Sequence, residues 1–231
     1  MQVAGVLLVL YLLAAYYVMP MVEKRRLGVN EADAISLPAV TLKFNRIPGD
    51  PLNVAIVGTE FEVRHAMSAA AWYRADHLSV RSFAREVRSI LGGKGYFSAP
   101  VSNLYCFGRR QDLAFEQPDG KFATRRHHVR FWQVPGSDAK GRLMWVGAAT
   151  FDRGIGLSRL TGELTHHIDP AVDAERDKVL ADLQQAQRVM KYTDTHPAGP
   201  IFDARNGEGD HYHSDGRMAV IILPTIEPPM D

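Results

Sequence analysis

Six of the nine histidines lie in three short clusters that also contain arginine or aspartate. The clusters are residues 125–132 (RRHHVRFW), 164–170 (LTHHIDP) and 209–217 (GDHYHSDGR). Histidine binds metals, transfers protons and holds anions, and its charge changes near neutral pH. If the three clusters converge in the folded chain, they form a functional site.

Alternation along a strand divides the first two clusters into faces, because every second residue points the same way. The polar face of the first cluster consists of Arg126, His128, Arg130 and Trp132. The polar face of the second consists of Thr165, His167 and Asp169. We therefore expect His128 and His167 to line one basic surface, and His127 and His166 to be buried with apolar residues.

Such a surface predicts either an anion site or a metal site. The candidate catalytic residues, which transfer a proton or orient the group that does, are His128, His167, Asp152 and Asp169. The candidate ligand-binding residues are Arg126, Arg130, Arg153, His211 and His213. A divalent cation bound by His128, His167 and Asp169 is the weaker alternative, since the neighbouring arginines repel a cation. Asp169 also precedes Pro170, so it is a candidate N-cap of a helix.

Hydrophobic periodicity and turn residues predict the elements that carry these clusters. Strands are expected at 40–44, 53–58, 104–107, 112–116, 127–134, 143–151 and 164–168, with a last one ending at 223. Helices are expected at 59–73, 82–91 and 170–190, and Thr59 with Glu62 has the spacing of a capping box. This order predicts an α+β domain with a mixed or mostly antiparallel sheet and helices packed on it.

An uncharged segment, residues 3–22, lies near the N-terminus. As a helix it spans about 30 Å, the thickness of a bilayer core. A cleaved signal peptide is the alternative, but its basic residues precede a shorter apolar core. Here Lys24, Arg25 and Arg26 follow the segment, which favours an uncleaved transmembrane helix. The positive-inside rule then places the following domain in the cytoplasm, with the periplasm as the alternative.

Other features narrow the classes of function. The chain has no Walker A loop, no GxGxxG, GxSxG or HExxH motif and no CxxC pair, which disfavours nucleotide binding, zinc peptidase and serine hydrolase chemistry. A net charge of +1, with no long basic tract, gives no support for nucleic-acid binding. Cys106 is the one cysteine, so an intrachain disulfide is excluded.

Several further segments resemble a known family. They are DPLNVAIVG at 50–58, SAPVSNLYCFGRRQDLAFEQP at 98–118, WVGAATFDRGIGLSR at 145–159, THHIDPAVDAERD at 165–177 and RNGEGDHYHSDGR at 205–217. Together with RHHVRFW they are similar to the LssY-like C-terminal domain over about residues 37–223. The family is named for a bacterial protein associated with secretion, and its members often follow membrane modules. The resemblance implies no catalytic residues, and it weakly favours a lipid or phosphate-bearing ligand.

The expected organisation is an anchor at 1–22, a linker and lead-in strand at 23–50, the domain at 51–223 and a tail at 224–231. We expect a single-pass protein of the bacterial inner membrane whose His/Arg site binds or hydrolyses a phosphate-bearing or lipid-linked ligand. The alternative is a non-catalytic binding or assembly module with envelope protein partners. No cofactor is expected beyond the metal alternative.

Overall fold

The computed structural model describes residues 38–43, 47–75, 103–120, 125–135, 142–157, 164–197 and 199–227. The expected membrane anchor at 1–22 and the expected helix at 82–91 lie outside these ranges. Within them, no helix combines the length and the apolar character needed to cross a bilayer.

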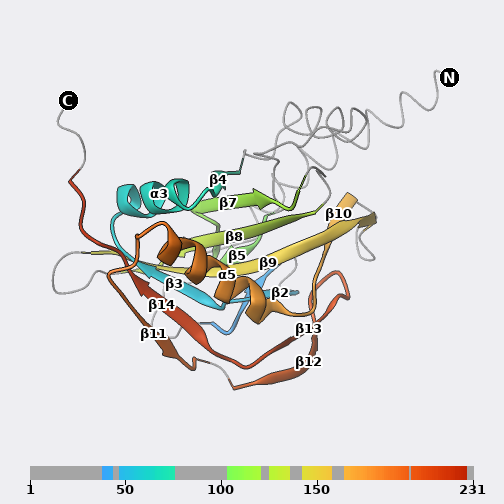
Figure 1. Ribbon diagram of the computed structural model, residues 1–231. Helices are drawn as coiled ribbons and strands as arrows, with labels where there is room; N and C mark the ends of the chain where they lie inside the picture. Colours follow the sequence, from blue (N-terminus) through green and yellow to red (C-terminus); the bar gives the residue numbers. More distant parts are fainter. Residues whose placement is uncertain are drawn as a thin grey trace.

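An eight-stranded sheet forms the centre of the domain (Figure 1). Its strands run in the order β11-β14-β3-β9-β8-β7-β4, and β10 pairs with the second half of β9. They are β3 (Val54–Val57), β4 (Tyr73–Arg74), β7 (Leu113–Pro118), β8 (Arg126–Gln133), β9 (Met144–Leu157), β10 (Leu164–Ile168), β11 (Lys191–Thr195) and β14 (Met218–Ile222). All pairings are antiparallel except that of β3 with β14. The predicted α+β class with a mostly antiparallel sheet is confirmed.

Two helices, α3 (Glu60–Ala69) and α5 (Val172–Gln185), pack on one face of this sheet. Buried side chains of both helices form one core with strand residues that include Ile56, Val129, Phe131 and Ile221. Helix α3 begins with the predicted capping box, in which the Glu62 amide donates to Thr59 Oγ1 and the Thr59 amide to Glu62 Oε2. The apolar half of β8 therefore faces the helices, as alternation predicts.

The start of α5 differs from the sequence-based expectation. Its N-cap is Ala171, which makes no side-chain capping bond. Asp169 Oδ1 instead accepts a hydrogen bond from the Ala171 amide at 2.9 Å. Asp169 thus closes a turn before the helix. The prediction that Asp169 is the N-cap is wrong, because the N-cap lies two residues later, at Ala171.

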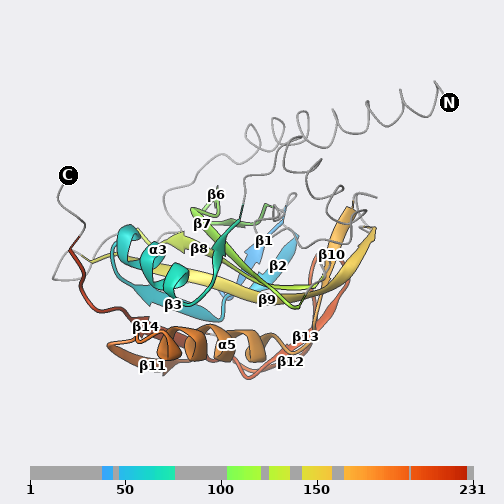
Figure 2. The same cartoon turned by 45° about the horizontal axis from the view of Figure 1, so that its top comes forward.

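The opposite face of the large sheet is covered by a second, four-stranded sheet of order β2-β1-β5-β6. Its strands are β1 (Val40–Leu42), β2 (Pro48–Pro51), β5 (Tyr105–Cys106) and β6 (Arg109–Arg110). Figure 2 shows β1 and β2 on the other side of β9 from α5. Leu104 and Cys106 pack there against Trp132 and Val146, and burial raises the pKa of Cys106 to about 12. A hairpin of β12 (Ile201–Arg205) and β13 (His211–Ser214) lies at one end of this layer.

Candidate functional site

Polar side chains gather on the face of β8 and β9 that points away from the helices. The antiparallel register places Arg126 opposite Asp152 and His128 opposite Thr150. Residues directly opposite in such a ladder project from the same face. All four side chains are buried. The pairing of β8 with β9 therefore brings a guanidinium and an imidazole next to a carboxylate and a hydroxyl group.

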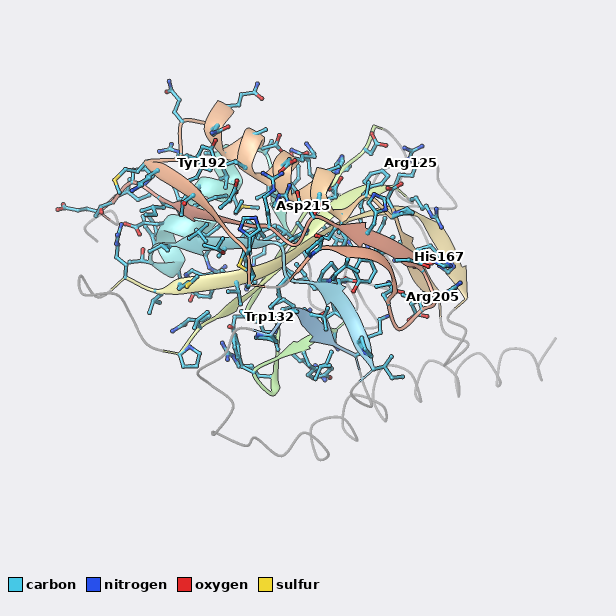
Figure 3. All side chains as sticks on the ribbon, turned by 90° about the horizontal axis from the view of Figure 1, so that it is seen from below. Arg125, Trp132, His167, Tyr192, Arg205 and Asp215 are labelled. Atoms are coloured by element: carbon cyan, nitrogen blue, oxygen red, sulfur yellow. The ribbon has the colours of Figure 1, made fainter. Side chains whose placement is uncertain are left out.

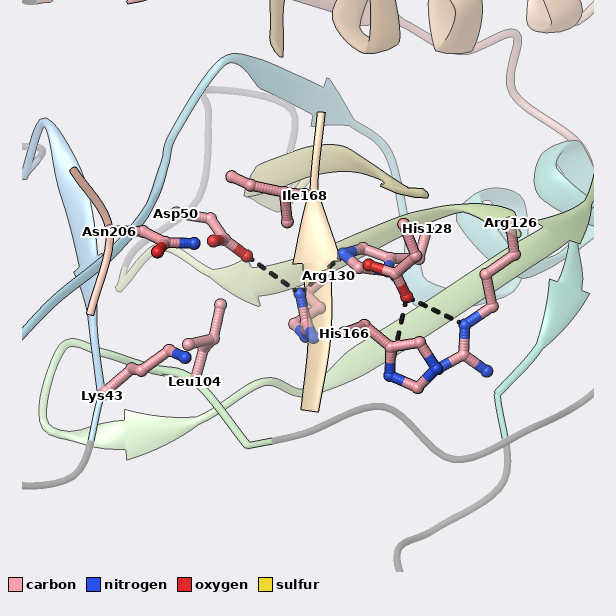
Figure 4. A pocket seen from close by; sticks show the side chains of 10 residues that line it. Lys43, Asp50, Leu104, Arg126, His128, Arg130, His166, Ile168 and Asn206 are labelled. Atoms are coloured by element: carbon pink, nitrogen blue, oxygen red, sulfur yellow. Dashed lines mark hydrogen bonds and ion pairs between the residues drawn. The ribbon is translucent and has the colours of Figure 1, made fainter. Parts of the chain in front are cut away.

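These side chains line a small cavity on this face of the sheet (Figure 4). The lining residues come from both sheets and from the turn after β12. They are Lys43, Asp50, Leu104, Arg126, His128, Arg130, Asp152, His166, Ile168 and Asn206. The cavity therefore joins the first two histidine clusters with Lys43 directly after β1, with Asp50 of β2 and with the turn that precedes the third cluster.

Asp152 lies at the centre of the polar contacts and is 1% exposed. Its Oδ2 accepts a hydrogen bond from Arg126 Nε at 3.1 Å and lies 3.1 Å from His128 Nδ1. Burial alone raises the pKa of a carboxyl group, but His128, His166 and Arg126 outweigh burial and hold the pKa of Asp152 well below its usual range. Asp152 is therefore an ionised carboxylate inside the protein.

His128 is held through one nitrogen of its ring. Arg130 Nη1 lies 3.1 Å from His128 Nε2, and Thr150 Oγ1 contacts the same nitrogen. A guanidinium can only donate, so Nε2 is the acceptor of this contact, and Nδ1 faces Asp152. His128 is thus oriented through Nε2, while its Nδ1 lies close to Asp152 Oδ2 without making a hydrogen bond among the described residues.

Each arginine of the predicted basic surface already has a carboxylate partner. Arg126 Nη1 donates to Glu116 Oε2 at 2.9 Å, in addition to its bond with Asp152. Arg130 Nη1 donates to Asp50 Oδ2 at 3.2 Å. Burial lowers the pKa of Arg130, while Asp50 and Asp152 oppose that shift. The sequence predicted a basic surface at this place. The structure shows instead a cavity whose arginines are paired with carboxylates.

The second cluster contributes His166, where the sequence predicted His167. His166 Nδ1 lies 4.0 Å from Asp152 Oδ2, and the His166 side chain is 21% exposed. Burial lowers the pKa of His166 to about 4, Asp152 opposes this shift, and the cations around it add to it. His166 and Ile168 do share a face, as predicted, but that face lines the cavity. The apolar neighbours of His166 on β10 led to the prediction that its side chain points into the apolar core. The face that it shares with Ile168 points into the polar cavity instead.

His167 projects to the other side of β10. Its Nδ1 lies 2.8 Å from Asp210 Oδ1, and Asp210 Oδ2 also accepts a hydrogen bond from the Ile168 amide. The ring covers Gly156 so closely that a Cβ there would be 2.3 Å from His167 Nε2. His167 therefore ties β10 to β9 and to the third cluster, while the cavity contains His128 and His166.

The turn before the third cluster contributes an amide and an acid to the site region, and the histidines of the cluster point outward. His211 and His213 lie on the exposed side of β13, and His211 Nδ1 pairs with Asp203 at 2.6 Å. Glu208 pairs at 2.5 Å with Lys43, which lines the cavity. Asn206 Oδ1 accepts from the backbone amides of Glu208 and Asp210, so the turn is held in place. Figure 3 shows His167 and Arg205 at the same end of the molecule.

The remaining predicted residues lie outside the cavity lining. Arg153 is exposed on β9, and Asp169 closes the turn before α5. The residues of the metal alternative are therefore separated. Across the part of the chain that the structure describes, no group of three or more His, Cys, Asp or Glu side chains is placed to hold a metal ion.

Sequence reasoning missed four residues that line or support the cavity: Lys43, Asp50, Glu116 and Asn206. Asp50 stands in Pro48–Pro51, whose prolines and glycine indicate a turn. The sequence did contain one indication of the role of Asp50, which is its position shortly before the buried strand that begins at Val54.

Comparison with known protein families matches most of the chain. The model of the family described as LssY C-terminus matches residues 34–218. The chain belongs to this family. The match spans β1 to the first residue of β14, so the cavity of this LssY C-terminal domain lies entirely within the family region. Neither the curated proteins nor the solved structures contain a match to the chain.

Proposed function

We propose that the cavity of this LssY C-terminal domain binds a phosphate-bearing or lipid-linked ligand at the bacterial inner membrane. One observation carries the proposal: Lys43, Arg126 and Arg130 converge on a single cavity with His128 and His166. Guanidinium and ammonium groups hold phosphate oxygens, and an adjacent imidazole transfers a proton. The expected membrane anchor would hold this domain, on the cytoplasmic or periplasmic side, close to lipid head groups.

The two histidines take different roles in this proposal. His128 is buried and its Nε2 is contacted by Arg130 and Thr150, so we assign it the role of positioning Arg130 and Asp152. His166 is neutral at neutral pH and partly exposed, so its ring is the one that can accept a proton from a bound molecule. Asp152 stabilises the imidazolium that results, because its carboxylate remains ionised beside the ring.

If the ligand is a phosphate ester, this arrangement supports hydrolysis. Water adds to phosphorus and loses a proton to His166, while the bond from phosphorus to the ester oxygen breaks. The departing oxygen then takes the proton from His166, so that an alcohol and inorganic phosphate are released. The arginines and Lys43 stabilise the charge on the phosphoryl oxygens during this step.

A non-catalytic binding or assembly module is the second candidate. The observation that favours it is the completeness of the ion pairs, since Arg126, Arg130 and Lys43 all have carboxylate partners. Such a lining is rigid before a ligand arrives, which suits recognition as well as catalysis. Release of inorganic phosphate separates the two candidates, because a binding module is stabilised by the ligand but leaves it intact.

The test uses the full chain in detergent micelles, with thermal unfolding followed in the presence of inorganic phosphate or glycerol phosphate at millimolar concentration. Both ligands should raise the unfolding temperature, and His166→Ala should abolish hydrolysis of glycerol phosphate. His211→Ala is the matched control, because it removes an exposed, aspartate-paired histidine outside the cavity. The proposal is rejected if neither ligand stabilises the protein. The catalytic version is rejected if His166→Ala releases phosphate as fast as the wild-type chain.

A further inference from the structure

Strand β11 forms one border of the large sheet (Figure 1). It pairs with β14 over five consecutive residues, without a shift of register and without a proline. No strand of the described ranges pairs with its other edge, and all five of its residues are exposed. Figure 3 shows Tyr192 of this strand at the opposite end of the molecule from His167 and Arg205. Proteins commonly protect such an edge with a bulge or a proline, and β11 has neither.

Two large apolar side chains are exposed at this edge. Met190, just before β11, is 61% exposed, and Tyr192 within it is 47% exposed. Among the described residues, only Phe61 and Tyr73 are other large apolar side chains that are exposed. Large apolar side chains beside an unpaired strand edge favour contact with a protein at this edge.

The hydrogen bonds of β14 show which backbone groups of β11 point outward. The Leu223 amide donates to β3, so the backbone groups of Val220, three residues earlier, point the other way, to β11. Val220 lies opposite Thr193, so the backbone groups of Thr193 face β14. Because these groups alternate along a strand, the N–H and C=O groups of Tyr192 and Asp194 point away from the sheet.

These outward groups are self-complementary. When two copies of β11 pair antiparallel about a two-fold axis at Thr193, Tyr192 of each copy lies opposite Asp194 of the other. Residues opposite each other in this way exchange both of their N–H···O=C hydrogen bonds, so every outward group gains a partner. Thr193 then lies opposite Thr193 of the second copy, and threonine pairs are favourable across antiparallel strands.

The charges and hydrogen bonds of the strand disfavour the other pairings of two copies. An axis at Asp194 places two carboxylates directly opposite each other. A parallel pairing in register places Lys191 beside Lys191 and Asp194 beside Asp194. An axis at Tyr192 requires the Met190 amide, which already donates to β14. The antiparallel pairing about Thr193 avoids all three conflicts.

We propose that β11 joins two copies of this chain into a two-fold dimer, with Thr193 at the axis and the large sheet continuing from one copy into the other. Such an interface uses the same surface on both copies, so the assembly closes at two. A five-residue pairing is small compared with the roughly 1,600 Å² that a stable interface buries, so we expect a dissociation constant of about 10–100 µM. The inference is independent of the ligand proposed for the cavity.

Sedimentation velocity of the full chain in detergent micelles, from about 1 to about 200 µM, measures the association. The wild-type protein should pass from monomer to dimer across this range. Thr193→Lys and Thr193→Glu should each weaken the association by about 5-fold or more, because like charges then meet at the axis. An equimolar mixture of the two variants should restore it, because lysine then faces glutamate. Thr193→Val is the matched control, since it is uncharged and suits a strand, and it should associate as the wild type does.

A disulfide between the copies tests the position of the axis. Thr193→Cys should form a covalent dimer with oxidised glutathione, because directly opposite residues lie within disulfide distance. Lys191→Cys is the matched control, because in this pairing it lies opposite Thr195 of the second copy and out of reach of its own equivalent. Cys106 does not interfere, since it is buried and burial raises its pKa to about 12. Non-reducing electrophoresis detects the product.

The outcomes decide the proposal. A protein that stays monomeric up to about 200 µM would overturn the dimer. Association that neither charged variant weakens would also overturn it, because another surface would then hold the copies together. Failure of the mixture to restore association, or equal cross-linking of Thr193→Cys and Lys191→Cys, would overturn the axis at Thr193. Restoration by mixing and cross-linking of Thr193→Cys alone are the results expected.

Discussion

Arg126 and Asp152 face each other across the β8–β9 ladder, and Arg126 Nε donates to Asp152 Oδ2 at 3.1 Å. Both side chains are buried, so neither charge is stabilised by bulk water. A buried ion pair of this kind gives little net stability, but removing one partner leaves the other charge without compensation.

Asp152→Ala should therefore lower the free energy of unfolding by about 3–5 kcal/mol. Arg126 and His128 both lose the carboxylate that they contact. Urea denaturation at pH 7 followed by circular dichroism measures the change. Asp203→Ala removes an exposed acid that pairs with His211, and its unfolding curve should coincide with that of the wild-type protein. Equal stability of the two variants would contradict the buried pairing.

His166 should make stability depend on pH in the mildly acidic range. Its pKa is about 4 in the folded chain and 6.5 without the fold, so the unfolded chain takes up the proton first. Stability is therefore complete above about pH 6.5 and falls as the pH decreases toward 4, by at most about 3 kcal/mol. The lowered pKa of Asp152 changes stability only below about pH 3.8, the ordinary pKa of an aspartate. The contributions of Asp152 and His166 to the pH dependence therefore fall in different pH ranges.

Denaturation midpoints at pH 7 and pH 5 check this dependence. His166→Asn should flatten the curve between these values, because the variant has no imidazole to protonate. His211→Asn, which changes an exposed histidine, should retain the slope of the wild-type protein. A His166→Asn curve as steep as that of the wild type would assign the slope to another group.

Gly156→Ala should displace His167 from Asp210. The new methyl group would stand 2.3 Å from His167 Nε2, so the ring must move, with an expected loss of about 1–3 kcal/mol. Gly154→Ala is the matched control on the same strand, because nothing lies within 4 Å of its added Cβ. In a His167→Ala background, Gly156→Ala should become nearly neutral. Persistence of the full loss in that background would show that the clash is elsewhere.

The pair Arg130 and Asp50 should couple the two sheets, since Asp50 belongs to β2 and Arg130 to β8. A double-mutant cycle with Arg130→Met and Asp50→Asn should give a coupling energy of about 1–3 kcal/mol. The exposed pair Arg64 and Glu60 within α3 should give less than about 0.5 kcal/mol in the same measurement. Equal coupling in the two pairs would indicate that the buried bond adds nothing to the contact between the sheets.

Local sequence patterns predicted one wall of the cavity well. Strand alternation placed Arg126, His128 and Arg130 together, because β8 lies in the middle of a sheet whose faces have different surroundings. The apolar face of β8 contacts the helices, as a pattern of alternating residues requires. Where a strand is regular and both of its faces are covered, the alternation of residues in the sequence is sufficient to predict which side chains share a face.

The rest of the cavity depends on contacts between distant segments. His166 has apolar neighbours on its face of β10, and only the position of β10 over Asp152 makes that face polar. Asp50 stands between prolines, and its role arises because β2 crosses the far side of the large sheet. No property of either residue alone distinguishes it from a core histidine or a turn aspartate, so these assignments required the tertiary structure.

The parallel pairing of β14 with β3 has a consequence for the order of folding. β14 lies between β3 and β11, yet it is the last of the described strands along the chain, more than 150 residues after β3. One edge of β3 therefore has no partner strand until most of the domain has been synthesised and β14 can pair with it. Contacts of such long sequence separation slow folding and expose strand edges during synthesis. The sheet of this domain is therefore completed only after β14 has been synthesised.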